Sequence, residues 1–198
     1  MPLHPQNNRS DAKLRIAPLF PPYEPPIADV LTKLMGSDRE PLKLFRTVAR
    51  NPALLGLLAD SGRLVFRKSS LPALHRELII QRATARCGAE YEWGVHAAIF
   101  GEQVGLTGDR LRATVAGDHA STCWSPEEAM LIEFVDALHE HAAIDDDLWV
   151  RMSRHWSEAQ MLELAMLAGL YHAISFVINV AGVAREEYAP AFPLKRPA

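Results

Sequence analysis

The chain has 198 residues, of which 48% are hydrophobic and 23% charged, an ordinary composition for a globular protein with one hydrophobic core. Its formal net charge is -3 and no run of lysine and arginine forms a basic surface, so nothing favours nucleic-acid binding. With only two cysteines, Cys87 and Cys123, a disulfide framework is excluded, and no continuous apolar stretch typical of a secretory signal opens the chain, so we expect a cytoplasmic protein.

Proline dominates the beginning of the chain. Residues 1–26 contain seven of the fourteen prolines, and proline has no N–H to donate to a helix or a sheet. This composition predicts an extended arm that wraps a neighbouring subunit. We expect a single all-α domain over residues 27–184 and a short tail over 185–198.

Helical periodicity follows the arm, in segments separated by short breaks. Apolar residues recur three and four positions apart, no strand-like alternation persists and no internal repeat is present. Pro72 near the start of one segment and Gly88 at its end match the usual asymmetry of helix termini. The helices are expected at residues 28–35, 40–50, 52–66, 71–88, 90–105, 107–117, from 125, 145–156 and from 157 onward.

Two helix starts carry capping signals. Ser125 is followed by Pro126 and Glu128, and Ser157 by Gln160, so each serine and the residue three positions later can satisfy each other's backbone N–H groups. Three aspartates at 145–147 favour a helix N-terminus through its dipole. These signals strengthen the prediction of an all-α fold.

The last helix needs a membrane test. Residues 164–184 contain no charged side chain and are long enough to span a bilayer. However, His172, Ser175 and Asn179 fall on one helical face, where neighbouring helices can pair them or a cavity can receive them. The sequence therefore predicts a central core helix and no membrane partner.

A second group of polar residues lies on the margin of an apolar stripe. Glu92 and His96 are four residues apart, so their side chains share a helix face. Glu77 precedes them among apolar neighbours, and a reversal at Gly88 would pack the two helices as a hairpin with Glu77 beside His96. Two carboxylates and an imidazole in an apolar setting predict a proton-transfer site. From composition and spacing alone, an exposed ion pair is the better explanation of Glu92 and His96, and the family resemblance described below is what favours a site.

Metal binding finds little support in the sequence. No H-E-x-x-H and no E-x-x-H motif occurs. The adjacent residues His139, Glu140 and His141 face different directions at the end of a polar helix, which is typical of a solvated helix end. We therefore predict no metal and no organic cofactor.

The stretch RELIIQRATARCGAEYEWGVHAAIF, residues 76–100, resembles the signature hairpin of the carboxymuconolactone decarboxylase family, which includes the alkylhydroperoxidase D-like proteins. The resemblance extends over about residues 40–184, and the last helix with Tyr171, His172 and Asn179 also looks similar. It implies an all-α, alkylhydroperoxidase D-like bundle with a central helical hairpin. It also implies self-association into dimers, trimers or hexamers.

The sequence departs from the redox branch of that family at its two thiols. The branch carries C-x-x-C, and those two positions correspond to Ala89 and Glu92 in this chain, whereas the flanking Glu77 and His96 are kept. Cys87 lies two residues too early to replace the first thiol. A dithiol peroxidase needs an attacking and a resolving thiol, which this hairpin does not supply.

The resemblance therefore implies decarboxylase-like acid/base chemistry on a small lactone or carboxylate. In this hypothesis His96 carries the proton, Glu77 orients its ring, and Glu92 is a second acid/base. Tyr91, Trp93 and His172 are expected to line the substrate pocket. Two alternatives stay open: a peroxide-reducing protein that uses Cys87, and a non-catalytic helical oligomer that binds a small molecule.

Overall fold

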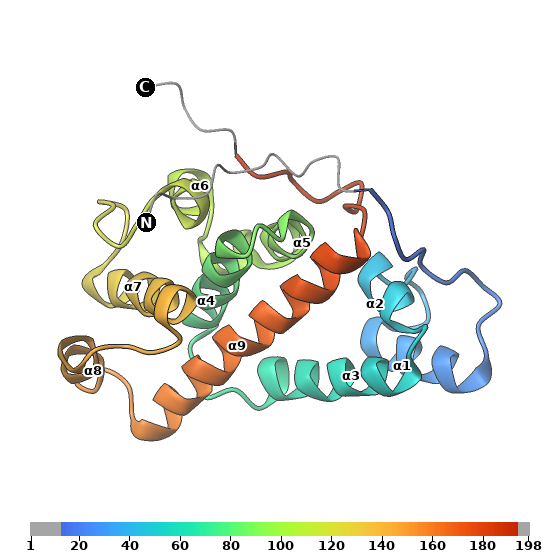
Figure 1. Cartoon of the computed structure of the whole chain (residues 1–198), viewed down its shortest axis with the longest axis horizontal. Coiled ribbons are helices and arrows are strands. Elements are labelled where there is room, and N and C mark those ends of the chain that lie inside the picture. Colours follow the sequence, from blue (N-terminus) through green and yellow to red (C-terminus); the bar gives the residue numbers. More distant parts are fainter. Residues whose placement is uncertain (1–12, 194–198) are drawn as a thin grey trace.

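The structure is a computed structural model that describes residues 13–193. Within that range the chain forms nine α-helices and one short 3-10 helix, with no strand, so the predicted all-α class is confirmed (Figure 1). In chain order they are α1 Pro25–Met35, α2 Lys43–Val48, α3 Pro52–Arg67, α4 Ala73–Arg86, α5 Glu90–Phe100, η2 Glu102–Val104, α6 Gly108–Ala116, α7 Pro126–His141, α8 Asp146–Met152 and α9 Glu158–Ala181.

The central helix of the bundle is α4. It packs against α5, α6, α7 and α9, and every residue from Glu77 to Thr84 is buried. A helix buried on all sides must pair its polar groups inside the protein. Glu77 and Arg82 belong to this buried run, so each needs a partner within the bundle.

The long helix α9 differs from its prediction as the central core helix. Leu164, Tyr171 and Ile178 face the interior, but Leu162 and Val180 on the opposite face are 74% and 66% exposed. In Figure 1, α9 crosses the molecule in front of α4. The periodicity of an almost uniformly apolar segment does not distinguish a buried helix from one with an uncovered apolar face.

Two apolar clusters meet along α9. One gathers residues of α4, α7, α8 and the first part of α9, and the other gathers residues of α1, α2, α3, α5 and the last part of α9. Ile174 packs against both clusters. Among the described residues α9 is also the one helix long and apolar enough to cross a membrane, a test that core helices of soluble proteins pass as well.

Capping explains where the later helices begin. Both predicted capping boxes are present, at Ser125 with Glu128 and at Ser157 with Gln160. Asp145 accepts a hydrogen bond from the backbone N–H of Leu148 at the start of α8. By contrast, the helix predicted over residues 90–105 stops at Phe100 and continues as the short η2.

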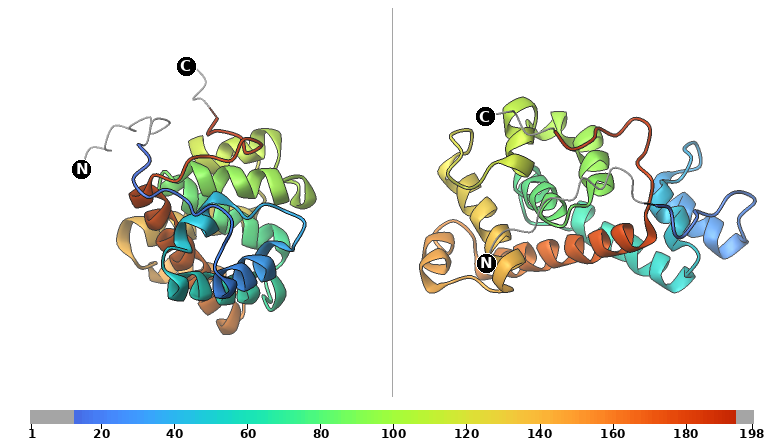
Figure 2. Two further views of the ribbon diagram at one scale, coloured as in Figure 1. Left: turned by 90° about the vertical axis from the view of Figure 1, so that its right-hand side faces the viewer. Right: turned by 45° about the horizontal axis from the view of Figure 1, so that its top comes forward.

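The described part of the N-terminal arm packs against its own chain. The backbone N–H groups of Arg15 and Ile16 donate to the carbonyl of Ala181, and that of Leu19 donates to the carbonyl of Arg46. Figure 2 shows this segment passing the end of α9. The first twelve residues of the predicted arm lie outside the described residues. For residues 13–24, the structure gives contacts with the same chain, whereas the sequence predicted contacts with a neighbouring subunit.

The C-terminal tail is fastened along α5. Glu186 accepts hydrogen bonds from the Tyr91 hydroxyl at 2.8 Å and from the backbone N–H of Lys43 at 2.7 Å. Farther along, the N–H of Phe192 donates to Glu90. A Cβ atom on Gly94 would lie 2.4 Å from the carbonyl oxygen of Pro190, so only glycine allows the tail to approach this closely.

Candidate active site

The reversal between α4 and α5 brings the predicted residues together. α4 ends at Arg86, Gly88 adopts a left-handed conformation with φ of 63°, and α5 begins at Glu90. The two helices pack against each other as the predicted hairpin. Glu77 on α4 therefore faces Glu92 and His96 on α5.

His96 is the centre of the polar group. Its Nδ1 atom lies 2.8 Å from Oε2 of Glu77, and its Nε2 atom lies 3.6 Å from Oε1 of Glu92. The hydroxyl oxygen of Tyr171, on α9, lies 3.2 Å from the same Nε2 atom. Three helices thus place two carboxylates and a phenol around one imidazole.

These four side chains are inside the protein. Glu77 is 1% exposed, His96 and Tyr171 are 4% exposed, and Glu92 is 7% exposed. An exposed Glu92–His96 ion pair, the competing interpretation of the sequence, is therefore wrong. Aromatic rings surround the imidazole: Phe66 stacks on it at a centroid distance of 6.2 Å, Phe100 lies at 5.2 Å and Tyr171 contacts it edge-on.

The electrostatic environment favours a charged imidazole. Burial alone would lower the pKa of His96, but the charge and hydrogen bond of Glu77, together with Glu92, outweigh it and raise the pKa to about 9. His96 is therefore protonated at neutral pH, with Nδ1–H donated to Glu77 and Nε2–H available on the other side. Burial and the two nearby carboxylates raise the pKa of Tyr171 well above its ordinary value, so its hydroxyl stays neutral.

Arg76 belongs to this environment although the sequence did not single it out. Its Nε atom lies 3.5 Å from Oε1 of Glu77, and its guanidinium group covers the Phe66 ring at 5.2 Å from the centroid. Phe66 itself is 40% exposed. The Phe66 ring therefore separates the buried imidazole from solvent, with the guanidinium group of Arg76 over its face.

Tyr91 and Trp93 make other contacts. The Tyr91 hydroxyl binds Glu186 and the backbone of Leu44, and the indole N–H of Trp93 donates to Thr114 at 2.9 Å. Both rings are almost fully buried. They fasten α5 to its surroundings, and neither hydrogen-bonds to the group around His96.

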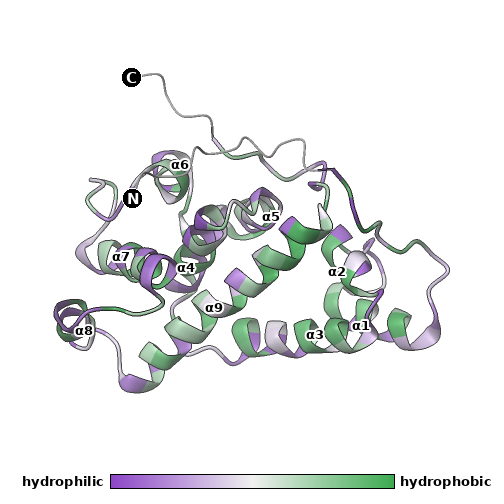
Figure 3. Ribbon diagram, viewed as in Figure 1, coloured by the Kyte–Doolittle hydropathy of each residue, from purple (hydrophilic) through white to green (hydrophobic). Residues whose placement is uncertain are grey.

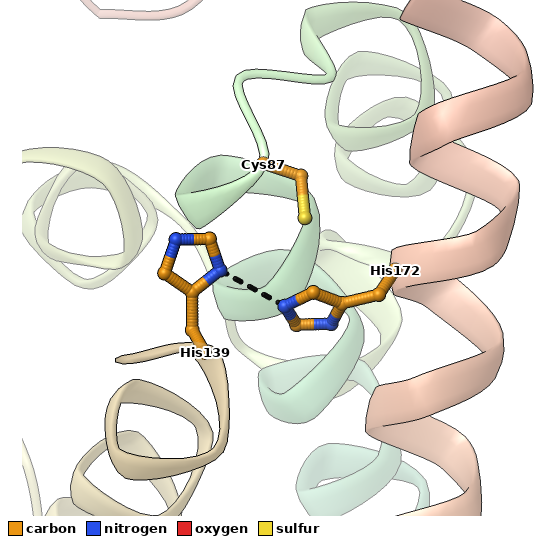
Figure 4. Close-up of side chains that lie close together, drawn as sticks. All are labelled: Cys87, His139 and His172. Carbon is orange, nitrogen blue, oxygen red and sulfur yellow. Dashed lines mark hydrogen bonds between the residues drawn. The ribbon is translucent and has the colours of Figure 1, made fainter. Parts of the chain in front are cut away.

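His172 lies in a second cluster, on another side of α9 from Tyr171. Its Nε2 atom is 2.9 Å from Nδ1 of His139, and Cys87 lies beside both rings (Figure 4). Burial raises the pKa of the Cys87 thiol to about 11, and this outweighs the opposite effects of the hydrogen bond to Ser175 and the charge of Arg86. A surface cavity of about 660 Å³ is lined by Cys87, His139 and Asn179, among others.

Arg82, which the sequence did not separate from surface arginines, is a buried structural residue. It is 3% exposed and forms two hydrogen bonds with the carboxylate of Asp136, at 2.7 and 2.6 Å. Its remaining donor group binds the carbonyls of Thr114 and Gly117. These contacts engage Nε, Nη1 and Nη2, so Arg82 is held inside the protein and is not available to a substrate.

Comparison with known proteins identifies the fold. No family model matches the chain, and no curated protein matches it. Among solved structures, a cysteine-to-alanine variant of the debrominase Bmp8 in complex with 2,3,4-tribromopyrrole matches with a TM-score of 0.73 and 16% identity, over 87% of this chain and 92% of that chain. The apo form of the same debrominase matches over the same shares, with a TM-score of 0.72 and 15% identity.

Both neighbours are debrominases, and this chain shares their helical, alkylhydroperoxidase D-like fold. The predicted alkylhydroperoxidase D-like fold is therefore confirmed. At this level of identity, the likeness concerns the arrangement of the helices.

Proposed function

We propose that this protein is an enzyme that carries out cofactor-free acid/base chemistry on a small lactone or related carboxylate, by decarboxylation or a related lyase or isomerase step. One observation carries the proposal: the imidazole of His96 is held between Glu77 and Glu92, with the hydroxyl of Tyr171 at its Nε2 atom. Charged groups are rarely retained in an apolar interior unless paired, and such arrangements concentrate at functional sites.

The chemistry requires a proton donor and an electron sink. In a lactone whose carboxylate is on the saturated ring carbon next to the carbonyl, or next to a C=C bond conjugated with it, the bond to the carboxylate breaks, carbon dioxide leaves and the electron pair moves into the carbonyl. The Nε2–H of His96 then delivers its proton to a ring carbon of the resulting enolate, which gives the product lactone. Because the substrate carbonyl accepts the electrons, no cofactor takes part.

Each neighbour of His96 has a distinct task in this scheme. Glu77 holds the ring through Nδ1 and stabilises the imidazolium form before the proton leaves. Glu92 is the most exposed of the four and returns a proton from solvent to Nε2. Tyr171, as a neutral hydroxyl, donates to the developing enolate oxygen.

Substrate would enter past Phe66. Its ring covers the imidazole but is 40% exposed, and it ends the stack formed with Phe100. Arg76 lies over that ring and would attract an anionic substrate to the entrance. We further propose a cytoplasmic location, because Cys87 and Cys123 are both free thiols, as expected in a reducing compartment.

The test is turnover of unsaturated lactone carboxylates in deuterated water. We expect release of carbon dioxide with one deuterium on a ring carbon of the product, and a decrease of about 10²- to 10⁴-fold in His96→Gln. His141→Gln, whose side chain is 72% exposed, is the matched control and should keep wild-type activity. The proposal fails if the wild-type protein turns over none of these compounds, or if a folded His96→Gln is as active as wild type.

Thiol chemistry at Cys87, including peroxide reduction, is the second candidate. Its position beside two histidines at a surface cavity favours it, and a halogenated pyrrole, which one structural neighbour binds, is a further substrate to screen. It ranks second because a thiol with a pKa of about 11 is protonated at neutral pH. A protein that only binds a small molecule would show ligand binding without turnover, unchanged in His96→Gln.

A further inference from the structure

We propose that Cys87, His139 and His172 form a binding site for a divalent transition-metal cation, with Zn²⁺ as the best match. The three side chains come from the C-terminal end of α4, the last turn of α7 and the middle of α9 (Figure 4). One ligand atom from each lies within 4.8 Å of the other two. This proposal does not depend on the function proposed for His96.

The orientation of His172 is that of a metal ligand. Its Nδ1–H donates to the carbonyl of Ala168 at 2.8 Å, so its Nε2 atom carries a lone pair directed at the cluster. Metal-bound histidines usually donate their other N–H to a carbonyl or carboxylate in this way. The backbone of α9 thus fixes both the ring and its tautomer before any ion arrives.

The spacing of the two imidazoles is close to that of a tetrahedral site. Nδ1 of His139 and Nε2 of His172 are 2.9 Å apart. Two nitrogens bound to tetrahedral Zn²⁺ at about 2.0–2.1 Å lie roughly 3.3 Å from each other. A shift of a few tenths of an ångström would therefore replace the hydrogen bond with a metal ion, and His139 would move its proton to Nε2.

A bound divalent ion would take the place of the proton on the Cys87 thiol, as at other thiolate sites. Arg86 is the nearest opposing charge, but it is paired with Asp136 and Glu140.

The site is open on one side. Cys87 and His139 line the surface cavity of about 660 Å³, so a fourth coordination position would face this cavity. One thiolate and two imidazoles suit Zn²⁺ better than Mg²⁺ or Ca²⁺, which prefer oxygen ligands. Three protein ligands with one open position are typical of zinc sites that bind water or a substrate.

The experiment uses untagged full-length protein stripped with a chelator and titrated with Co²⁺ as a spectroscopic substitute for Zn²⁺. We expect one equivalent to bind, with a thiolate-to-cobalt absorption band that Zn²⁺ abolishes. The band should disappear in Cys87→Ala, and affinity should fall at least tenfold in His139→Ala and His172→Ala. Cys123→Ala and His141→Ala are matched controls that should keep both the absorption band and the wild-type affinity.

Native mass spectrometry with Zn²⁺ measures the stoichiometry on the wild-type chain and needs no variant. Circular dichroism in chelator shows whether each variant is folded. The site is refuted if wild type binds no stoichiometric metal, if the thiolate band is missing, or if the band survives in Cys87→Ala.

A different observation supports a second inference: the exposed face of α9 binds a second copy of this chain. Residues on that face repeat with alternating spacings of four and three, the pattern of a helix–helix seam. Figure 3 shows most of the C-terminal half of α9 as hydrophobic. We call this set the α9 stripe; it consists of Leu162, Met166, Gly169, Ala173, Phe176 and Val180, all exposed.

The α9 stripe is symmetric about position 171. In an antiparallel pair of α9 helices, Leu162 would face Val180, Met166 would face Phe176, and Gly169 would face Ala173 of the other copy. Large residues thus meet large residues at both ends, and the small pair at the centre lets the backbones approach. This self-complementarity is what a two-fold interface requires, and it favours a second copy over an unrelated partner.

Charge also supports the antiparallel arrangement. Arg15 donates to the carbonyls of Asn179 and Val180 at one end of the stripe. Glu158, in the first turn of α9, lies at the other end. In the antiparallel pair, Arg15 of each copy would approach the end of the partner's α9 that carries Glu158.

Sedimentation equilibrium tests this interface. We expect wild type at twice the 22.0 kDa of the chain, and monomers for Met166→Glu and Ala173→Glu. Leu57→Glu, at a position on α3 that is 61% exposed, should stay dimeric. A monomeric wild type, a dimer that survives both α9 substitutions, or recruitment of wild type to phospholipid vesicles through α9 would overturn the inference.

Discussion

The Nδ1 atom of His96 lies 2.8 Å from Oε2 of Glu77, nineteen residues earlier, in a part of the protein that solvent does not reach. This contact joins α4 to α5. A buried imidazole with a carboxylate on each side keeps its proton inside the protein, where its pKa is raised. Its consequences for stability and for binding can be measured.

Stability should decrease at alkaline pH because of His96. Its pKa rises from 6.5 to about 9 on folding, so its contribution is complete below pH 6.5 and is lost as pH rises through 9. The shift corresponds to on the order of 3 kcal/mol. We expect urea denaturation to show this decrease between about pH 6.5 and pH 10.

The matched variants for this pH dependence are His96→Gln and His141→Gln. The first should flatten the profile, because no buried imidazole then gains a proton on folding. The second changes an exposed histidine and should keep the wild-type slope. A wild-type protein with the same unfolding free energy at both ends of the range would contradict the protonated His96.

Arg82→Ala should strongly destabilise the protein. It leaves Asp136 and the carbonyls of Thr114 and Gly117 without their buried partner, and breaking such a pair typically costs about 3–5 kcal/mol. Arg112→Ala removes an exposed ion pair with Asp109 and should cost less than about 1 kcal/mol. Equal unfolding free energies for the two variants would show that the Arg82 network is not structural.

Cys87 should react slowly with thiol reagents in the native protein. With its pKa raised from 9.0 to about 11, the thiolate fraction at neutral pH falls about a hundredfold. In a Cys123→Ala protein, the rate of Cys87 labelling should increase only as the pH approaches 11. In urea, the unfolded protein should label at the rate of an ordinary thiol, with its acceleration near pH 9. Rapid labelling at pH 7 would instead favour the thiol-based function.

Arg76→Gln should raise the KM for anionic substrates by about tenfold and leave kcat nearly unchanged. Its guanidinium group lies beside Phe66 at the proposed entrance and makes no hydrogen bond to the imidazole, so it would attract the substrate without taking part in the proton transfer. Arg63→Gln, on the exposed part of α3, is the control. A fall in kcat alone would place Arg76 in the chemical step.

The hairpin could be predicted from the sequence because its information is local. Glu92 and His96 are one helical turn apart, and the break at Gly88 determines that α4 and α5 fold back on each other. The position of Glu77 beside His96 follows from that reversal. For the same reason the capping boxes at Ser125 and Ser157 were predictable, since all their atoms lie within four residues.

The contribution of α9 could not be predicted in the same way. Tyr171 and His172 are adjacent, and one residue corresponds to a rotation of about 100° around the helix. Which of them faces His96 depends on how α9 packs against α4, and an apolar segment leaves that rotation undetermined. The cluster of Cys87, His139 and His172 is harder still, because His139 and His172 are 33 positions apart and meet only through tertiary packing.

The tail along α5 has a consequence for the order in which the protein is completed during synthesis. The hydroxyl of Tyr91 donates a hydrogen bond to Glu186, which is 95 residues later in the chain. Glu90 accepts one from the backbone N–H of Phe192, which is 102 residues later. The helix that carries Glu92 and His96 therefore leaves the ribosome long before the segment that fastens it. Nascent chains stalled before Glu186 should hold α5 loosely, and the proton-carrying group should reach its final geometry only after nearly the whole described chain has emerged.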